Sequence, residues 1–303
     1  KPTFFVGTGD NVYYDVPRGP AAKTRAELRQ KWHEQFVQPR FVSLFADVPT
    51  YWEKDDHDHR YNDSDRTGDR LPGHELGVEI FREQVPIVDP RDSVAVTYRT
   101  HRLSRHLQIW LPEGRDYRGE NKSPDGPEKT IWGAEQLAWF KRTLLGSDAT
   151  FKLLISATPL VGPDDAYKSD NHVNQKGFRF EGDAIFAWLK ENGFLEKNFY
   201  IVCGDRHWQY HSAHPSGFEE FSTGTLVDAN ARKGRDPGDP DSTDPNAEIK
   251  QIYTYEEPTG GFLMVTVAES EDGSGAFANF SFYNEKGEKL YGVKKQGSVT
   301  SDQ

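Results

Sequence analysis

At 303 residues the chain is long enough to bury a substantial core within one domain. Its formal net charge of −11 argues against a nucleic-acid-binding or polybasic membrane-binding surface, and no apolar stretch approaches the length of a membrane-spanning helix. Its one cysteine excludes an intrachain disulfide and a thiolate cluster for zinc.

Apolar runs and helical periodicity predict strands that alternate with helices. In chain order, we expect a strand at 3–10, a helix at 25–45, a strand at 48–53, a helix at 77–83, a hairpin of 93–100 and 106–112, a helix at 131–145, a strand at 151–157, a helix at 181–192 followed by Gly193 as its cap, a strand at 199–203, and two antiparallel strands at 261–267 and 276–283. Polar loops are expected at 60–75, 119–130 and 232–248. This order predicts an α/β fold in an α+β variant, with a single domain over 1–290 and a polar tail over 291–303.

Three of the predicted strands end in residues that bind hard or borderline metal ions. The first is followed by Gly9-Asp10 with Tyr13 and Asp15, the second by Asp55-Asp56-His57-Asp58-His59, and the strand 199–203 by Gly204-Asp205-Arg206-His207. Open α/β sheets keep their sites at the carboxyl ends of the strands, so we expect these residues to form one polynuclear metal site. The sequence therefore predicts a hydrolase.

The third cluster allows a finer prediction. Side chains alternate along a strand, which places Asp205 and His207 on one face with Arg206 pointing away. His172 follows a predicted strand and is expected at the rim of the pocket.

Together these motifs resemble the PhoD-like alkaline phosphatases of the calcineurin-like metallophosphoesterase superfamily. The pattern Gly-Asp-x-x-Tyr-x-Asp occurs at 9–15, Asp-Asp-His-Asp at 55–58 and Gly-Asp-x-His at 204–207. The stretch 111–118 is similar to the family's Leu-x-Asp-x-Arg-x-Tyr-Arg, with Glu113 in place of the Asp. The four motifs stand in the expected order up to about residue 225. The resemblance implies a β-sheet sandwich flanked by helices, with the site at the carboxyl ends of the strands.

The resemblance also implies roles for individual residues. The implied metal ligands are Asp10 as the bridging carboxylate, Tyr13, Asp56 and Asp205. The implied catalytic residues are His57 and His207, together with Arg115, whose planar guanidinium suits bidentate phosphate recognition. Arg115, Asn62 and His172 are the expected substrate-binding residues.

Alternatives remain open for four of these positions. Tyr13 could instead lie over the end of the sheet, and Asp15 could be either a ligand or a turn residue. The alternative for His207 is contact with the substrate rather than the metal. Arg115 could form a surface salt bridge with a neighbouring carboxylate, either Asp116 or Glu120.

The implied function is metal-dependent hydrolysis of phosphoric esters, both diesters and monoesters, by in-line attack of metal-bound hydroxide. The implied cofactors are two or more metal ions, iron(III) plus calcium, with other divalent ions possible. The alternatives are a phospholipase D-like diesterase and a non-catalytic metal-binding fragment.

The expected partner is a small phosphate ester, with no nucleic-acid-binding surface and no membrane span; the oligomeric state is open. The family resemblance implies an extracytoplasmic protein, either periplasmic or secreted. The chain starts at Lys1 without a signal peptide and without the family's first metal-ligand strand, so we expect that an N-terminal part is missing.

Overall fold

The computed structural model describes residues 1–15, 19–89, 91–92, 94–271, 273 and 275–297. Its strands form three sheets. The largest has the order β3-β4-β5-β6-β8-β7-β9 and consists of Arg99–Arg102 (β3), Leu107–Leu111 (β4), Phe151–Ser156 (β5), Phe199–Cys203 (β6), Gln209–Ala213 (β7), Glu219–Thr223 (β8) and Lys250–Thr254 (β9). Phe5–Thr8 (β1) and Thr50–Glu53 (β2) pair in parallel, and an antiparallel meander is formed by Gly261–Glu269 (β10), Ala276–Asn284 (β11) and Lys289–Gly297 (β12).

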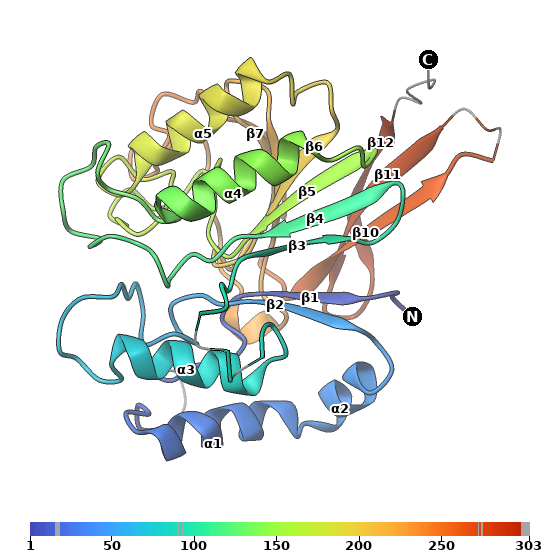
Figure 1. Cartoon of the computed structure of the whole chain (residues 1–303). Coiled ribbons are helices and arrows are strands. Elements are labelled where there is room, and N and C mark those ends of the chain that lie inside the picture. The colour runs from blue at the N-terminus through green and yellow to red at the C-terminus, as the bar shows by residue number, and fades with distance from the viewer. Residues whose placement is uncertain (16–18, 90, 93, 272, 274, 298–303) are drawn as a thin grey trace.

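Helices flank the large sheet and the β1–β2 pair, whereas none of the described helices lies on the outer face of the β10–β12 meander (Figure 1). They are Arg25–Phe36 (α1), Pro39–Phe45 (α2), His74–Gln84 (α3), Gly133–Leu145 (α4) and Arg179–Glu191 (α5), with a short 3₁₀ turn at Asp228–Asn230. Helices α4 and α5 lie over the large sheet, whereas α1, α2 and α3 lie beyond β1 and β2 on the opposite side (Figure 1). The predicted α/β sandwich flanked by helices is confirmed.

Strand β5 shows why the large sheet is central. All six of its residues are buried, as expected for a strand covered on both faces. Leu154 belongs to the apolar cluster under α4 and α5, whereas Leu153 and Ile155 belong to the cluster between the two sheets. The aromatic rings of Phe221 and Phe280 stack across that second interface, with centroids 4.1 Å apart.

The third apolar cluster attaches the first helices to β2. Trp32 of α1 and Phe81 of α3 are buried and pack against each other, and Trp52 of β2 belongs to the same cluster. Helix α1 begins with a capping box in which Thr24 and Glu27 exchange hydrogen bonds, so its start is fixed by the local sequence.

The helix predicted at 25–45 is divided into α1 and α2. Pro39 has no N–H to continue the helical hydrogen-bond pattern, and a residue before proline favours extended backbone. Gln38 accordingly has ψ of 129° and separates the two helices.

The ends of several other elements differ from the prediction. The predicted polar tail begins too early, because residues 291–297 belong to β12, whose polar sequence is ordered by pairing with β11; 298–303 lie outside the described residues. The first strand of the hairpin starts at Arg99 rather than 93, and Ser93 also lies outside the described part. Strands β7, β8 and β9 were not predicted.

The topology brings the strand-end motifs to one edge. Strands β1 and β2 are parallel to each other, and β4, β5, β6 and β8 are parallel within the large sheet. The loop after β5 is held by Glu220 of β8, whose carboxylate accepts the backbone N–H groups of Leu160, Val161 and Gly162 at 2.6, 3.1 and 2.9 Å. This anchor fixes the path of the chain that carries the next acidic residues.

Candidate metal centre

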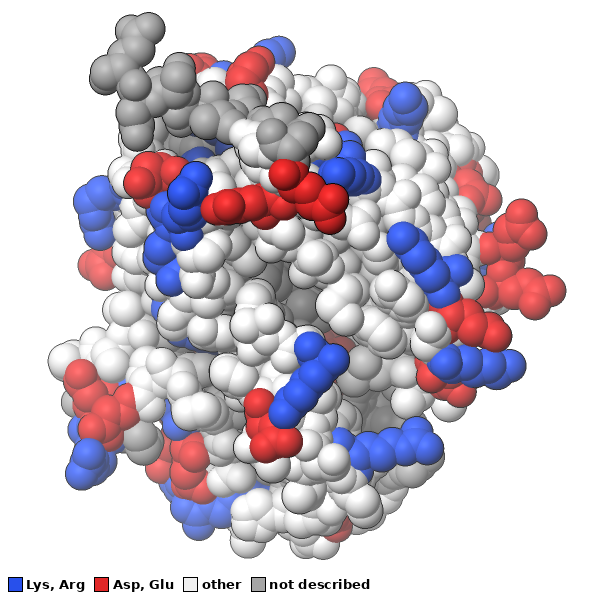
Figure 2. All heavy atoms as spheres, turned by 90° about the vertical axis from the view of Figure 1, so that its right-hand side faces the viewer, with Lys and Arg blue, Asp and Glu red and all other residues white. Residues whose placement is uncertain are grey.

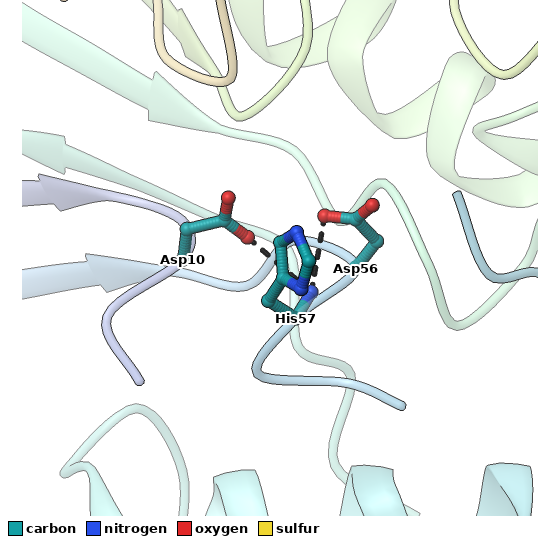
Figure 3. A group of neighbouring side chains, drawn as sticks. All are labelled: Asp10, Asp56 and His57. Carbon is teal, nitrogen blue, oxygen red and sulfur yellow. Dashed lines mark hydrogen bonds between the residues drawn. The ribbon is translucent and has the colours of Figure 1, made fainter. Parts of the chain in front are cut away.

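Asp10, Asp56 and His57 meet where β1 and β2 end (Figure 3). The backbone N–H of His57 donates to Asp10 Oδ1 at 3.3 Å and to Asp56 Oδ1 at 3.0 Å. A ring nitrogen of His57 and one carboxylate oxygen from each aspartate lie within 4.8 Å of one another. Three potential ligand atoms at this spacing can surround a single metal ion.

A layer of polar contacts orients this first group. His57 Nδ1 lies 2.6 Å from Asp15 Oδ1, and the rings of Tyr13 and His57 stack with centroids 4.1 Å apart. Burial opposes the charged imidazolium, but the carboxylates of Asp10, Asp15 and Asp56 outweigh it and raise the pKa of His57 to about 10. Asp15 therefore holds His57 in place, a role that lay outside both alternatives for this residue.

Tyr13 connects the first group to the loop after β6. Its hydroxyl donates to Asp10 Oδ2 at 3.1 Å and lies 3.4 Å from His207 Nε2. Burial, followed by the charge of Asp10, raises the pKa of the Tyr13 hydroxyl, so the protein alone disfavours the phenolate. A cation at this position would be required to stabilise the phenolate form.

A second acidic group shares Asp56 with the first. One carboxylate oxygen each from Asp56, Asp63 and Asp170 lie within 4.8 Å of one another. The backbone N–H of Asp63 donates to Asp56 Oδ2, and the Lys168 ammonium donates to Asp63 Oδ1. The described chain thus offers two neighbouring positions for cations, and the residue common to both is Asp56 rather than Asp10, to which the resemblance assigned the bridging role.

The surroundings of the Asp170 carboxylate indicate whether a cation fits at the second position. Both of its carboxylate oxygens are buried and have no hydrogen-bond partner among the described residues. Its nearest positive group is Arg115 Nη2, 3.6 Å from Oδ2. A buried carboxylate without hydrogen bonds is costly, and three clustered carboxylates suit a hard cation with oxygen ligands. The residues present therefore fit a metal ion.

Neither Asp63 nor Asp170 was predicted as a ligand. Asp63 directly follows the selected Asn62, and Asp170 lies two residues before the selected His172. In the sequence, these two aspartates could have been suspected only from their closeness to Asn62 and His172. The fold shows that both carboxylates lie next to that of Asp56.

The loop after β6 adopts an unusual backbone. Asp205 and His207 have φ of 62° and 61°, and Asp10 and Asp63 have φ of 53° and 54°. Non-glycine residues in this left-handed region are uncommon and are often found at functional sites. Because β6 ends at Cys203, the strand alternation assumed for Asp205 and His207 does not apply, and that part of the prediction is wrong.

The two residues accordingly have different surroundings. The Asp205 carboxylate pairs with Arg206, which is buried and also binds Asp164. His207 instead reaches Tyr13, and burial, with the charges of Arg232 and Arg206, lowers the pKa of His207 to about 4. A neutral imidazole offers a lone pair to a metal or a proton acceptor to a substrate.

Arg115 is not placed to bind an incoming phosphate. Its side chain is fully buried, and Nε and Nη2 both donate to Asp55 Oδ1, at 2.7 and 2.5 Å, while Nη1 donates to the Ser64 carbonyl at 2.8 Å. This geometry contradicts direct substrate recognition, and it differs from the surface salt bridge with Asp116 or Glu120. Arg115 instead ties the loop after β4 to the loop after β2.

His172 is also placed differently from the prediction. It is buried, its Nε2 lies 2.9 Å from Glu181 Oε2, and its ring packs edge-on against Trp132. These contacts belong to the packing of α5, so the predicted place at the substrate-pocket rim is wrong. Asn62 is exposed, and its backbone N–H donates to Asp15 Oδ2 at 2.9 Å. A side-chain contact of Asn62 with metal or phosphate stays a prediction.

The mixed α/β fold with helices on its flanks is metallophosphoesterase-like. The family model of the PhoD-like phosphatases matches residues 1–266, and the chain belongs to that family. Seven chains of solved structures are similar to it. One, described as the structure of PhoD, has a TM-score of 0.70 at 15% identity, with 98% of this chain and 66% of that chain covered.

A dimetal phosphatase from Danio rerio aligns with a TM-score of 0.48 and 12% identity over 98% of this chain and 100% of its own. The chain spans 66% of the length of the PhoD structure. No curated protein matches the sequence significantly.

Proposed function

We propose that the protein is a metal-dependent hydrolase of phosphoric esters, acting on diesters and monoesters. The observation that carries this proposal is the pair of ligand groups that share Asp56 at the carboxyl ends of the strands. Membership of the PhoD-like phosphatase family supports it. Two adjacent cation positions suit phosphoryl transfer to water, because two metal ions can stabilise both the attacking and the leaving oxygen.

The residues of the chain have distinct roles in this proposal. When bound, two metal ions activate a water molecule and neutralise charge on the phosphoryl group. Asp56 would supply an oxygen to each position, and Asp10, together with the Tyr13 hydroxyl bound to it, would complete the first. His57 is within reach of the first position, but in this proposal it is held by Asp15 and donates a proton to the departing alkoxide instead of binding the metal. Neutral His207, whose Nε2 lies 3.4 Å from the Tyr13 hydroxyl, offers a proton acceptor to the substrate.

We also propose iron(III) and calcium as the ions. A tyrosinate is a ligand for a trivalent metal, and the Tyr13 hydroxyl lies 3.1 Å from Asp10 Oδ2. The second group contains carboxylates only, which suits calcium. Asp205 would join the first position on release from Arg206.

Elemental analysis with a visible spectrum and an activity assay tests the function. We expect two or more ions per chain, a tyrosinate-to-iron absorption band, and hydrolysis of bis(4-nitrophenyl) phosphate and 4-nitrophenyl phosphate. One ion or none, without hydrolysis, would favour the non-catalytic fragment. Hydrolysis confined to phospholipid headgroup esters would favour the phospholipase D-like alternative.

Lys168 is the cation that we propose for contact with the phosphoryl oxygens, in place of Arg115. Its ammonium is bound to Asp63 and its side chain is 10% exposed. Burial opposes the charge, but Asp170, Asp63 and Asp56 outweigh it and raise the pKa of Lys168, so the ammonium is retained throughout the neutral range. Lys168→Gln should raise the inhibition constant of inorganic phosphate about tenfold, as expected for loss of a charge-assisted hydrogen bond.

The control for this prediction is Lys176→Gln, because Lys176 is an exposed lysine on the same loop. Metal content is measured in parallel for both variants. An unchanged phosphate constant together with lost metal would mean that Lys168 only positions Asp63.

We propose a small phosphate ester as the partner and, from the family resemblance, an extracytoplasmic location. None of the described helices is long and apolar enough to span a membrane. On the face shown in Figure 2, basic and acidic side chains are interspersed, without a continuous basic surface. This distribution is consistent with a small-molecule substrate rather than a polyanion bound along that face.

A further inference from the structure

A pocket of about 350 Å³ lies next to the metal centre, on the other side of Asp15. Besides Asp15, its walls include Lys23, Tyr61, Arg70 and Pro72, and we call it the Arg70 pocket. It lies between the chain that leads into α1 and the loop that leads into α3. Its volume is in the range of small-molecule sites, which begins at about 300 Å³.

The pocket is connected to the candidate metal centre through shared residues. Asp15 forms part of the pocket wall, and its Oδ1 lies 2.6 Å from His57 Nδ1. Tyr61 stands in the sequence between His57 and Asp63, which belong to the two ligand groups. Asp15 thus lies between this pocket and His57, past which the alcohol departs in the proposed function.

The pocket has an excess of positive charge in an acidic protein. Lys23 and Arg70 are exposed, and within the described residues neither side chain forms an ion pair with a carboxylate. Arg70 lies over the Tyr61 ring at 4.0 Å, which restricts where its guanidinium can point. The one acidic group in the wall, Asp15, is already engaged with His57.

Arg60 adds charge to the pocket and organises its loop. It is fully buried and donates five hydrogen bonds to backbone carbonyls, those of Pro72, Asp65, Thr67, Gly68 and Arg70. These use all five of its N–H groups, so Arg60 is not available to a ligand. Its positive charge remains, however, and its hydrogen bonds hold the loop that presents Arg70. The site is therefore built before a ligand arrives.

We propose that the Arg70 pocket binds the alcohol portion of the phosphate ester and selects alcohols that carry an anionic group, such as a carboxylate. This inference rests on the proposed function, and it adds the substrate class. Arg70 and Lys23 contact the anionic group, and the ring of Tyr61 borders the carbon skeleton. An arginine guanidinium matches a carboxylate with two parallel hydrogen bonds.

Two phosphate esters that differ by a single charge test the proposal: phenyl phosphate and 4-carboxyphenyl phosphate. With the metal-loaded protein, we expect kcat/KM to favour 4-carboxyphenyl phosphate about tenfold, and Arg70→Gln to reduce this preference to about twofold or less through KM. Lys23→Gln should reduce it partly. Arg105→Gln is the matched control, because Arg105 is an exposed arginine in the turn between β3 and β4, at the amino end of β4.

Binding of the corresponding phosphonates, phenylphosphonate and 4-carboxyphenylphosphonate, is measured by calorimetry on the same variants. If the protein hydrolyses neither ester but binds the carboxylated phosphonate more tightly in an Arg70-dependent manner, the proposed function fails and the pocket stands. If both esters are hydrolysed with the same preference in wild type and Arg70→Gln, and both phosphonates bind equally, the pocket proposal is overturned.

Discussion

Replacing Asp56 with asparagine should remove both activity and metal from the protein. Asp56 is the only residue that belongs to both ligand groups of the described chain, so its loss weakens both cation positions at once. We expect turnover to fall by at least about 100-fold, since an amide oxygen lacks the charge that a hard cation requires. Metal content by elemental analysis should fall in parallel.

The substitution keeps the shape of the side chain, so the fold should persist. Asp56 accepts the N–H groups of His57 and Asp63, and asparagine can replace only one of these acceptors, at a cost of about 1 kcal/mol. Asp69→Asn, at an exposed position on the loop after this cluster, is the control and should change neither property. Full metal content with wild-type turnover in Asp56→Asn would contradict the shared-ligand assignment.

Arg115→Ala should destabilise the protein by about 3–5 kcal/mol, the range for breaking a buried ion pair. The substitution leaves the Asp55 carboxylate and the Ser64 carbonyl buried without their partner. It also removes the positive group nearest to Asp170. Urea denaturation measures the effect as a lowered midpoint.

Two further variants distinguish this structural role from phosphate binding. Arg115→Lys keeps the charge but cannot reproduce the paired contacts of Nε and Nη2, so intermediate stability is expected. Arg91→Ala, which removes an exposed arginine paired with Asp89, should leave the midpoint unchanged. Normal stability of Arg115→Ala with a large loss of phosphate affinity would restore the substrate-binding role predicted from the sequence.

Local sequence was sufficient to predict helix ends that are fixed by interactions between neighbouring residues. Thr24 and Glu27 start α1 through reciprocal hydrogen bonds, and Gly193 follows α5 with φ of 68°, a conformation that glycine adopts without steric cost. Pro39 shows the same principle, because its division of the long predicted helix follows from its own chemistry.

The meeting of Asp10, Tyr13, Asp56 and His57 could also be predicted. Each residue follows a strand that runs parallel to a neighbour, and parallel strands bring their carboxyl ends to one edge. The order of the motifs along the chain also indicated the family, since family membership is read from sequence motifs and needs no knowledge of tertiary contacts.

Other features were decided only when distant segments packed together. Residues 289–297 have a polar sequence without a strand signal, yet they form β12 because β11 supplies the partner for their backbone hydrogen bonds. Arg115 and Asp55 are 60 positions apart, and no local pattern reveals that their loops are buried against each other. The same applies to Asp63 and Asp170, whose approach to Asp56 creates the second cation position.

The sequence by itself thus determined the strand-end motifs, the family and several helix ends, since each depends on residues that are neighbours in the chain. The tertiary structure decided which charged residues face the site and which are bound to other loops and so only support the site. A buried charge must find its partner in three dimensions, and the identity of that partner depends on packing between loops rather than on sequence distance.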